Sequence, residues 1–103
     1  MIKVSILYPY EEGKTFDMDY YCSSHMPMVQ RLLGDACKKV EVEQGLAGTI
    51  PGSPPTYLAM GHIFFDNLEE LTSSLSKHSN TFMADVPNFT NATLVGQISE
   101  VKM

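Results

Sequence analysis

The sequence predicts an α+β fold in which two helices cover one face of a four-stranded antiparallel sheet. Four short segments are rich in alternating or β-favouring apolar residues, as strands are, and two longer segments repeat apolar residues every three or four positions, as helices do. The six segments follow in the order β-α-β-β-α-β, which is the ferredoxin-like arrangement. At 103 residues the chain suits one domain, so we expect residues 1–103 to fold as a unit.

The first part of the chain predicts one strand and one helix. Residues 2–8, IKVSILY, alternate between an apolar and a more polar face. From Phe16 onward apolar residues recur at helical spacing, and Gly34 is a stop signal for this helix. Either Thr15 or Asp17 has a side chain that can cap the helix start.

The rest of the chain supplies three strands and one helix. In chain order we expect a strand at 38–45, a connection rich in glycine and proline at 45–56, a strand at 57–65, a helix beginning after Asp66 or Asn67 and ended by Pro87, and a final strand at 93–101.

The strand at residues 57–65 indicates how the sheet is covered. It is apolar on both faces: Leu58, Met60 and Phe64 point one way, and Tyr57, Ile63 and Phe65 point the other. The helices cover only one face, and an uncovered apolar sheet face marks a site of association. We therefore expect a homodimer in which two sheets face each other and form a dimeric α+β barrel.

Composition and charge exclude several partners. Seven Lys and Arg residues against twelve Asp and Glu residues give a formal net charge of -5, and no run of basic residues exceeds two. Such a surface favours neither nucleic acid nor an anionic membrane. No stretch approaches the roughly 18 apolar residues of a membrane helix, and the first residues enter a strand pattern without a leader signal. We expect a cytoplasmic protein.

The two cysteines predict neither a disulfide nor a metal site. Cys22 and Cys37 fall on the apolar side or at the end of the first helix, which would hold them some 20 Å apart at about 1.5 Å per residue. Cys22 and His25 form one pair at helical spacing, but zinc requires three or four protein ligands. The sequence carries no phosphate-binding or dinucleotide-binding motif. We expect free thiols, no metal and no cofactor.

His25 is the first candidate functional residue. It lies on the inward stripe of the first helix, with Tyr21 one turn before it. Pro27 lacks an N–H and disfavours helical geometry at the preceding residue, so we expect a kink near residues 24–26 with Pro27 opening a second helical segment. The ring of His25 either satisfies a backbone acceptor freed by the kink or has a functional role, as an acid/base group or in orienting a ligand.

His62 is the second candidate. It shares its strand face with Met60 and Phe64. If this face lies against the helices, His62 is a core histidine; if it lines the barrel, it is one polar group in an apolar pocket, as in a small-molecule site. The sequence leaves both open. We expect His78, on the apolar stripe of the second helix, to have a packing or a helix-end role.

Four sequence blocks together resemble the EthD family, named for ethyl tert-butyl ether degradation. The blocks are FDMDYYCSSHMPMV, YLAMGHIFF, ADVPNFTNA and QISEV, and they extend over nearly the whole chain. The resemblance implies the dimeric α+β barrel superfamily, whose members include cofactor-free monooxygenases, lactone isomerases and polyketide cyclases acting on small hydrophobic or aromatic molecules. The positions that match the family blocks are His25, Pro27, Gly61, His62, Asp85, Pro87 and Asn88.

The residues and the resemblance together lead to two hypotheses of function. The first is a small-molecule enzyme, an oxidoreductase of monooxygenase-associated type or an isomerase, that works without a cofactor on a small hydrophobic compound in a barrel pocket. Its candidate catalytic residues are His25 and His62, and its candidate substrate-binding residues are Tyr21, Met60, Phe64 and Asp85. The second is a non-catalytic accessory or ligand-binding dimer that serves a partner enzyme. A dimer whose histidines are only structural remains a third reading.

Overall fold

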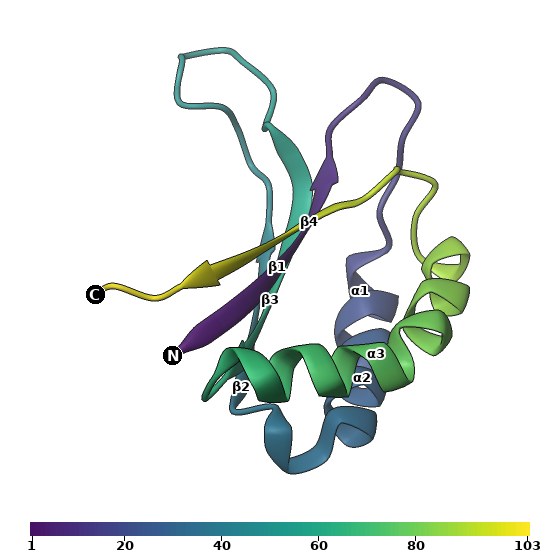
Figure 1. The fold of residues 1–103 in the computed structure, drawn as a ribbon. Coiled ribbons are helices and arrows are strands. Elements are labelled where there is room, and N and C mark those ends of the chain that lie inside the picture. The colour runs from purple at the N-terminus through teal and green to yellow at the C-terminus, as the bar shows by residue number, and fades with distance from the viewer.

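The computed structural model describes residues 1–103 and has the predicted order of elements. The strands pair antiparallel in the order β2-β3-β1-β4 (Figure 1), which confirms the predicted fold class. The elements are β1 Ile2–Pro9, α1 Met18–Tyr20, a π-helical turn Tyr21–His25, α2 Met26–Leu33, a 3₁₀ turn Gly34–Ala36, β2 Lys39–Gln44, β3 Tyr57–Phe65, α3 Leu68–Asp85, a 3₁₀ turn Val86–Asn88 and β4 Val95–Glu100.

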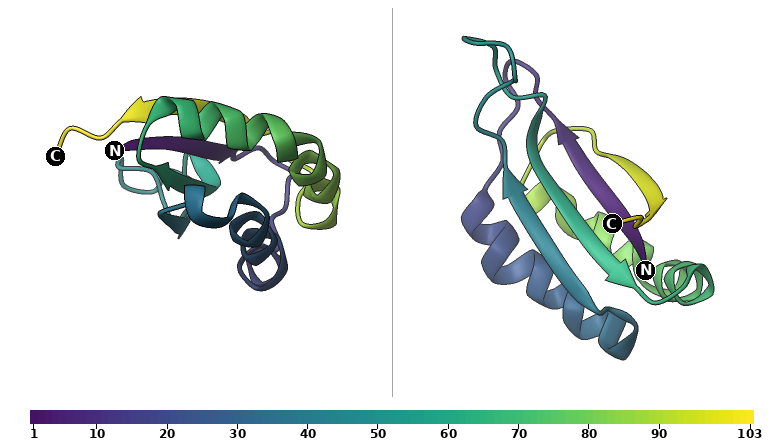
Figure 2. Two further views of the ribbon diagram at one scale, coloured as in Figure 1. Left: turned by 60° about the horizontal axis from the view of Figure 1, so that its bottom comes forward. Right: turned by 90° about the vertical axis from the view of Figure 1, so that its left-hand side faces the viewer.

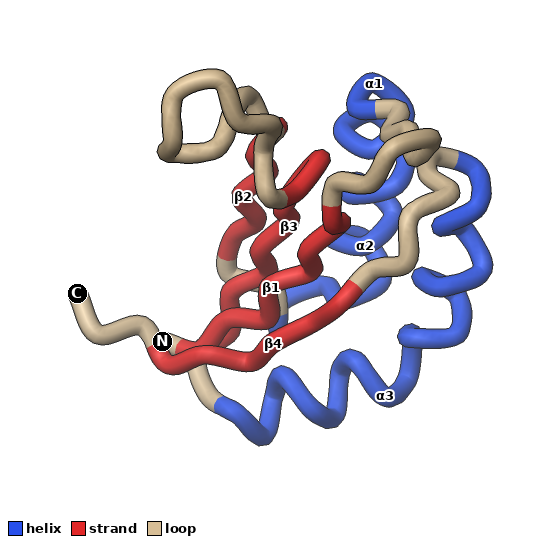
Figure 3. The backbone as a smooth tube through the Cα atoms, turned by 90° about the horizontal axis from the view of Figure 1, so that it is seen from above, coloured by secondary structure: helices blue, strands red, loops and turns tan.

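The molecule has two layers. Figure 2 shows the four strands in front of the helices when the sheet is viewed on its open face, and Figure 3 shows all helices on the other side of the sheet. Within one chain the open face therefore has no covering element. The two termini lie near each other at one end of the sheet (Figure 1).

Strand register determines which side chains face the helices. In the two central strands Val4 is paired with Ile63, and Ile6 with Gly61. Because directly paired residues share a face, these four residues and their alternate neighbours point toward the helices. The core beneath the helices is formed by buried residues of all layers: Val4, Tyr8, Tyr21, Met26, Val29, Leu33, Ala59, Ile63, Phe65, Leu71, Phe89 and Ala92.

The open face is more polar than the sequence pattern indicates. Phe64 is buried there although no helix covers it, because the ammonium groups of Lys3 and Lys39 lie 5.7 and 4.5 Å from the centre of its ring. These cations cover an apolar ring while their charges stay solvated. The expectation of a purely apolar face needs correction, since charged side chains from the neighbouring strands flank its aromatic centre.

The first helix differs from the expected kinked helix. Asp17 caps its start by accepting a hydrogen bond from the Tyr20 N–H at 3.0 Å. The chain then widens into the π-helical turn, in which the N–H of Met26 reaches the carbonyl of Tyr21 five residues back. Pro27 falls in the first turn of α2, where its missing N–H costs no hydrogen bond. One wide turn thus accommodates the proline without breaking the helix.

The second helix forms as the sequence predicts. The side chain of Asn67 caps α3 by accepting from the Glu70 N–H at 2.9 Å, and Glu69 and Glu70 lie at the positive end of the helix dipole. The helix ends at Asp85, and Pro87 lies in the 3₁₀ turn that follows. This stop places the side chain of Asp85 at the end of a rigid element.

Three smaller expectations can be compared with the structure. Cys22 is exposed, so the prediction that it lies on the inward stripe of the first helix was wrong. Cys37 is half-buried, and both cysteines are free thiols. His78 is half-buried and tilts against Phe82 with 6.0 Å between ring centres, in agreement with a packing role. No helix has the length and apolar character needed to cross a membrane.

Candidate functional site

The loop after the second helix is tied to the loop before the first helix. The Asp17 N–H donates to the Phe89 carbonyl at 2.8 Å, and the Thr90 hydroxyl donates to the Thr15 carbonyl at 2.6 Å. In the other direction, the Thr15 N–H donates to the side chain of Asn91 at 2.9 Å. These bonds hold the C-terminal end of α3 against the start of α1, two segments that lie about 75 positions apart in the chain.

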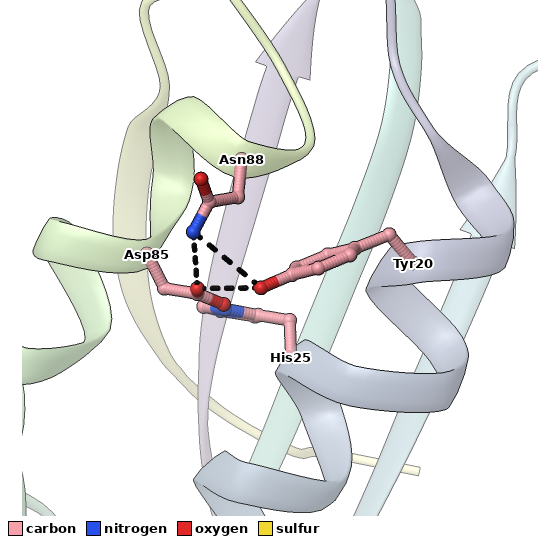
Figure 4. Close-up of polar contacts among 4 residues, drawn as sticks. All are labelled: Tyr20, His25, Asp85 and Asn88. Atoms are coloured by element: carbon pink, nitrogen blue, oxygen red, sulfur yellow. Dashed lines mark hydrogen bonds and ion pairs between the residues drawn. The ribbon is translucent and has the colours of Figure 1, made fainter.

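Four polar side chains meet where these segments join (Figure 4). Asp85 is at their centre: Nδ1 of His25 lies 2.8 Å from its Oδ2, and the Tyr20 hydroxyl donates to its Oδ1 at 2.8 Å. Asn88 donates from Nδ2 to the same Oδ1 at 2.9 Å and approaches the Tyr20 oxygen at 3.5 Å. Each carboxylate oxygen therefore has at least one donor, and the orientation of the carboxylate is fixed.

These contacts set the protonation state of Asp85 and the tautomer of His25. Burial raises the pKa of Asp85, but hydrogen bonds from His25, Asn88 and Tyr20 outweigh it and hold the pKa below its ordinary value. The bond to the carboxylate in turn raises the pKa of Tyr20, which stays a donor. Because an ionised carboxylate can only accept, Nδ1 of His25 carries the proton. In the uncharged ring Nε2 is then an acceptor.

Aromatic rings fix the imidazole plane. His25 is 5% exposed and stacks on Tyr21 with 5.3 Å between ring centres and 14° between planes. Phe89 packs against the imidazole with 4.6 Å between ring centres. No hydrogen bond joins Nε2 to any other protein group. The ring is thus held by Asp85 at one nitrogen and left free at the other.

His25 lines a cavity between the sheet and the helices of the same chain. The cavity has a volume of about 70 Å³, and eleven of its thirteen lining residues are hydrophobic. Its walls come from β1, β3, the first helix and α3, and Met83, 52% exposed, is one of its outer residues. This composition is that of a small-molecule site: an apolar surface with few polar groups. Its position differs from the expected pocket between two sheets.

Gly61 makes room for Tyr21 in this cavity. A Cβ atom at Gly61 would lie 2.1 Å from the Tyr21 hydroxyl oxygen and 3.2 Å from its Cζ. Only a residue without a side chain allows the hydroxyl end of the phenol to lie this close to β3. In the Gly-His pair that the sequence singles out, Gly61 thus has a clear role on the helix side of the sheet.

The predicted site residues separate into two groups. His25, Tyr21 and Asp85 come together on the helix side of the sheet. His62, Met60 and Phe64 lie on the open face, because their positions in β3 alternate with those of the buried Gly61 and Ile63. This answers which way His62 points, and it shows that the six residues do not form one site.

His62 has its own hydrogen-bonded surroundings on the open face. The Ser5 hydroxyl lies 2.7 Å from Nδ1, and Nε2 lies 3.1 Å from Oε1 of Glu43. The carboxylate accepts from Nε2–H, so Nδ1 accepts from the serine, a tautomer opposite to that of His25. No group of three His, Cys, Asp or Glu side chains is placed to hold a metal ion.

Two residues of this candidate site were not predicted from the sequence. Tyr20 is five positions before His25, which in a regular α-helix would put the two on different faces. The π-helical turn adds one residue and brings both side chains to Asp85. Pro27 was the available signal for this irregularity. Tyr8, a cavity residue from β1, was read only as part of an apolar strand face.

Comparisons with known proteins agree with this architecture. The model of the EthD domain matches residues 11–93. An EthD-like protein of Ralstonia eutropha JMP134 has 44% identity and a TM-score of 0.94, with 99% of this chain and 92% of that chain covered. An uncharacterised 11.0 kDa protein of Rhodococcus erythropolis, from the thcB-thcC intergenic region, is 27% identical over 90 residues, 86% of this chain and 84% of its own length.

A more distant structure shares the fold alone. A dimeric ferredoxin-like protein of unknown function from Thermobifida fusca has 10% identity and a TM-score of 0.58, with 97% of this chain and 90% of that chain covered. The chain therefore shares its fold with both of these solved structures.

Proposed function

The chain belongs to the EthD family, and we propose that it is an enzyme whose His25 transfers a proton to and from a small apolar molecule in the cavity. One observation carries this proposal: a buried imidazole is oriented by a carboxylate through Nδ1, while its Nε2 has no protein partner and the ring lines an apolar cavity. This is how a general base is held.

Each polar residue then has a role in the proton transfer. His25 accepts the substrate proton at Nε2, and the ionised Asp85 stabilises the imidazolium that results. Tyr20 and Asn88 hold the carboxylate in the plane that faces the ring. A positioned base of this kind contributes about 10²- to 10⁴-fold to a rate. Removing a proton is a step that the isomerase and oxidoreductase hypotheses share.

The cavity indicates the kind of substrate. Its hydrophobic lining favours an uncharged molecule, because a charge would lose its hydration there. With about 70 Å³ available, the enclosed part accepts only a small group, and a larger body would have to extend past Met83 at the outer edge. We therefore expect a compact apolar substrate with one reactive end.

Hydrogen–deuterium exchange tests this proposal without knowledge of the natural substrate. A panel of small carbon acids, a nitroalkane, a nitrile and a cyclic ketone, would be incubated with the protein in D₂O and analysed by mass spectrometry. We expect His25→Ala to slow the exchange of an accepted probe by about 10²-fold or more. His78→Ala, a histidine outside the cavity, is the matched control and should keep the rate.

The outcomes separate the two hypotheses of function. Exchange catalysed equally by the wild type and by His25→Ala would overturn the acid/base role. Saturable binding of a probe with no exchange at all would instead favour the accessory, ligand-binding role.

We also propose that the open sheet face pairs with a second copy of the chain. On this face Leu58 and Met60 are half-buried and Val95 is 48% exposed. The lysines lie beside Phe64 and the glutamates lie further along β2, so the face carries both charges and can be complementary to itself. Sedimentation at low protein concentration should show a dimer, and Met60→Lys should weaken it. A wild-type protein that remains a monomer at all concentrations would contradict the pairing.

A further inference from the structure

Two phenols complete the wall of the cavity around His25. Tyr8 from β1 and Tyr21 from the π-helical turn are each 1% exposed, and both line the cavity together with the imidazole. Their rings meet edge to face with 5.7 Å between centres. Apart from the histidine, these two hydroxyls are the polar groups in a lining that is otherwise aliphatic or aromatic.

The two hydroxyls supply two hydrogen-bond donors, and the protein does not supply an acceptor for each of them. The two phenols are neighbours that influence each other's ionisation, and no hydrogen bond joins either hydroxyl to a carbonyl, a carboxylate or another side chain of the protein. One interaction between two phenols uses one O–H, so the second O–H is left for whatever occupies the cavity. An acceptor atom of a ligand in the cavity would give this O–H the hydrogen bond that the protein does not supply.

Both phenols stay protonated over the working range of the protein. Burial raises the pKa of Tyr21 to about 12, although its neighbour Tyr8 opposes this effect, and burial also raises the pKa of Tyr8. The free group is therefore an O–H donor and not a phenolate. This O–H can donate to a ligand oxygen that accepts hydrogen bonds and gains negative charge. A cation or a plain hydrocarbon would leave the O–H without an acceptor.

The position of Tyr21 is fixed from two sides. Its ring stacks on His25 at 14°, and its hydroxyl oxygen occupies the space where Gly61 has no side chain. Tyr21, whose hydroxyl can donate, and His25, whose Nε2 can accept, therefore line the same small cavity. A ligand that satisfies both must accept a hydrogen bond on an oxygen and carry a proton that can be removed.

We propose that the cavity binds a small apolar molecule with a single weakly acidic oxygen function, a phenol, an enol or an enolisable ketone, whose oxygen receives the hydrogen bond of the Tyr8–Tyr21 pair. The proposal extends the proposed function, since it assigns the substrate class to the same site. In a phenol a single hydroxyl group makes both hydrogen bonds: its O–H donates to Nε2 of His25, and its oxygen accepts from the tyrosine hydroxyl.

For a ketone the corresponding step is enolisation. The proton of the carbon next to the carbonyl moves to Nε2 of His25, and the electrons of that C–H bond form the C=C bond. The carbonyl π electrons move to the oxygen, where the tyrosine O–H stabilises the enolate. Return of the proton from the imidazolium to the oxygen gives the enol, and return to carbon gives hydrogen exchange or an isomer. No oxidant or other reactant takes part.

The test compares the binding of phenol with that of toluene, which has the same shape but no hydroxyl. Dissociation constants would be measured by titration with NMR detection for the wild type, Tyr21→Phe, Tyr8→Phe and the double variant. We expect the wild type to bind phenol about 10-fold more tightly than toluene, and the double variant to lose this preference while its toluene affinity is kept. Tyr10→Phe, at an exposed tyrosine outside the cavity, is the control and should keep the preference.

The result is independent of turnover, so it can fail separately from the proposed function. Equal affinity for phenol and toluene in the wild type, or an unchanged preference in the double variant, would overturn the assignment of the oxygen-binding pair. Proton exchange that depends on His25 could still be observed in that case. Conversely, a preference for phenol that Tyr→Phe removes, with no exchange in any carbon acid, would support the pair and contradict the acid/base role.

Discussion

Substituting alanine for Gly61 should disturb the cavity more than any other change of similar size. The added Cβ would lie 2.1 Å from the Tyr21 hydroxyl oxygen, and real Cβ contacts are essentially never shorter than 3.0 Å. The phenol must therefore move by about 0.9 Å or more, and it cannot do so freely because it is stacked on His25. Overpacking of this kind costs about 1–3 kcal/mol.

Thermal unfolding followed by circular dichroism measures this cost. For a domain of this size each kcal/mol lowers Tm by about 4–8 °C, so Gly61→Ala should lower Tm by roughly 5 to 20 °C. Gly96→Ala is the matched control: both glycines are paired with Ile6, but a Cβ at Gly96 would meet its nearest atom at 3.7 Å. That substitution should be neutral or slightly stabilising.

A double-mutant cycle locates the clash. Tyr21→Phe removes the oxygen that the new methyl group would meet, so the cost of Gly61→Ala should become smaller in the Tyr21→Phe background. If Gly61→Ala were as well tolerated as Gly96→Ala, the phenol would not lie over β3, and the arrangement of the cavity wall argued above would be refuted.

The other predictions concern the carboxylate network and a helix cap. Because the pKa of Asp85 is lowered on folding, its network contributes stability that is complete above the ordinary carboxyl pKa of about 4 and is lost as the pH falls through the lower folded pKa. The Tm difference between the wild type and Asp85→Asn should therefore shrink as the pH falls below about 4; a difference that stays the same across this range would refute this. Asn67→Ala should cost about 1 kcal/mol in denaturant unfolding through loss of the cap on α3, whereas Asn80→Ala, exposed within the same helix, should cost less; equal effects would contradict the capping role.

The fold was predictable because local patterns and global topology agree. The strand at Tyr57–Phe65 has the predicted bounds, since its apolar run lies between a proline-rich connection and the Asn67 cap. The final strand is shorter than the expected 93–101, at Val95–Glu100, as edge strands often are. The polarity of the open face was less predictable, because lysine side chains that cover Phe64 are read from the sequence as plain surface charge.

The site was predictable only in part. The sequence singles out His25 and, through the family resemblance, Asp85, but their contact across sixty positions depends on how the loops at residues 15–17 and 89–91 join. Helical periodicity assumes 3.6 residues per turn, so it could not bring Tyr20 onto the face of His25. Strand alternation shows which residues share a face but not which face the helices cover. The structure was therefore needed to place His62 on the open face.

The tautomer of His25 distinguishes a general base from a histidine that only packs. Long-range ¹H–¹⁵N NMR distinguishes a protonated from a bare ring nitrogen, and it needs no substrate. In the uncharged ring we predict a proton on Nδ1 and a bare Nε2, with the Nε2 signal moving when phenol is added; His62, held by Ser5 and Glu43, should show the opposite tautomer in the same spectrum. A proton on Nε2 of His25, or an Nε2 signal that no ligand perturbs, would contradict a general base at this site.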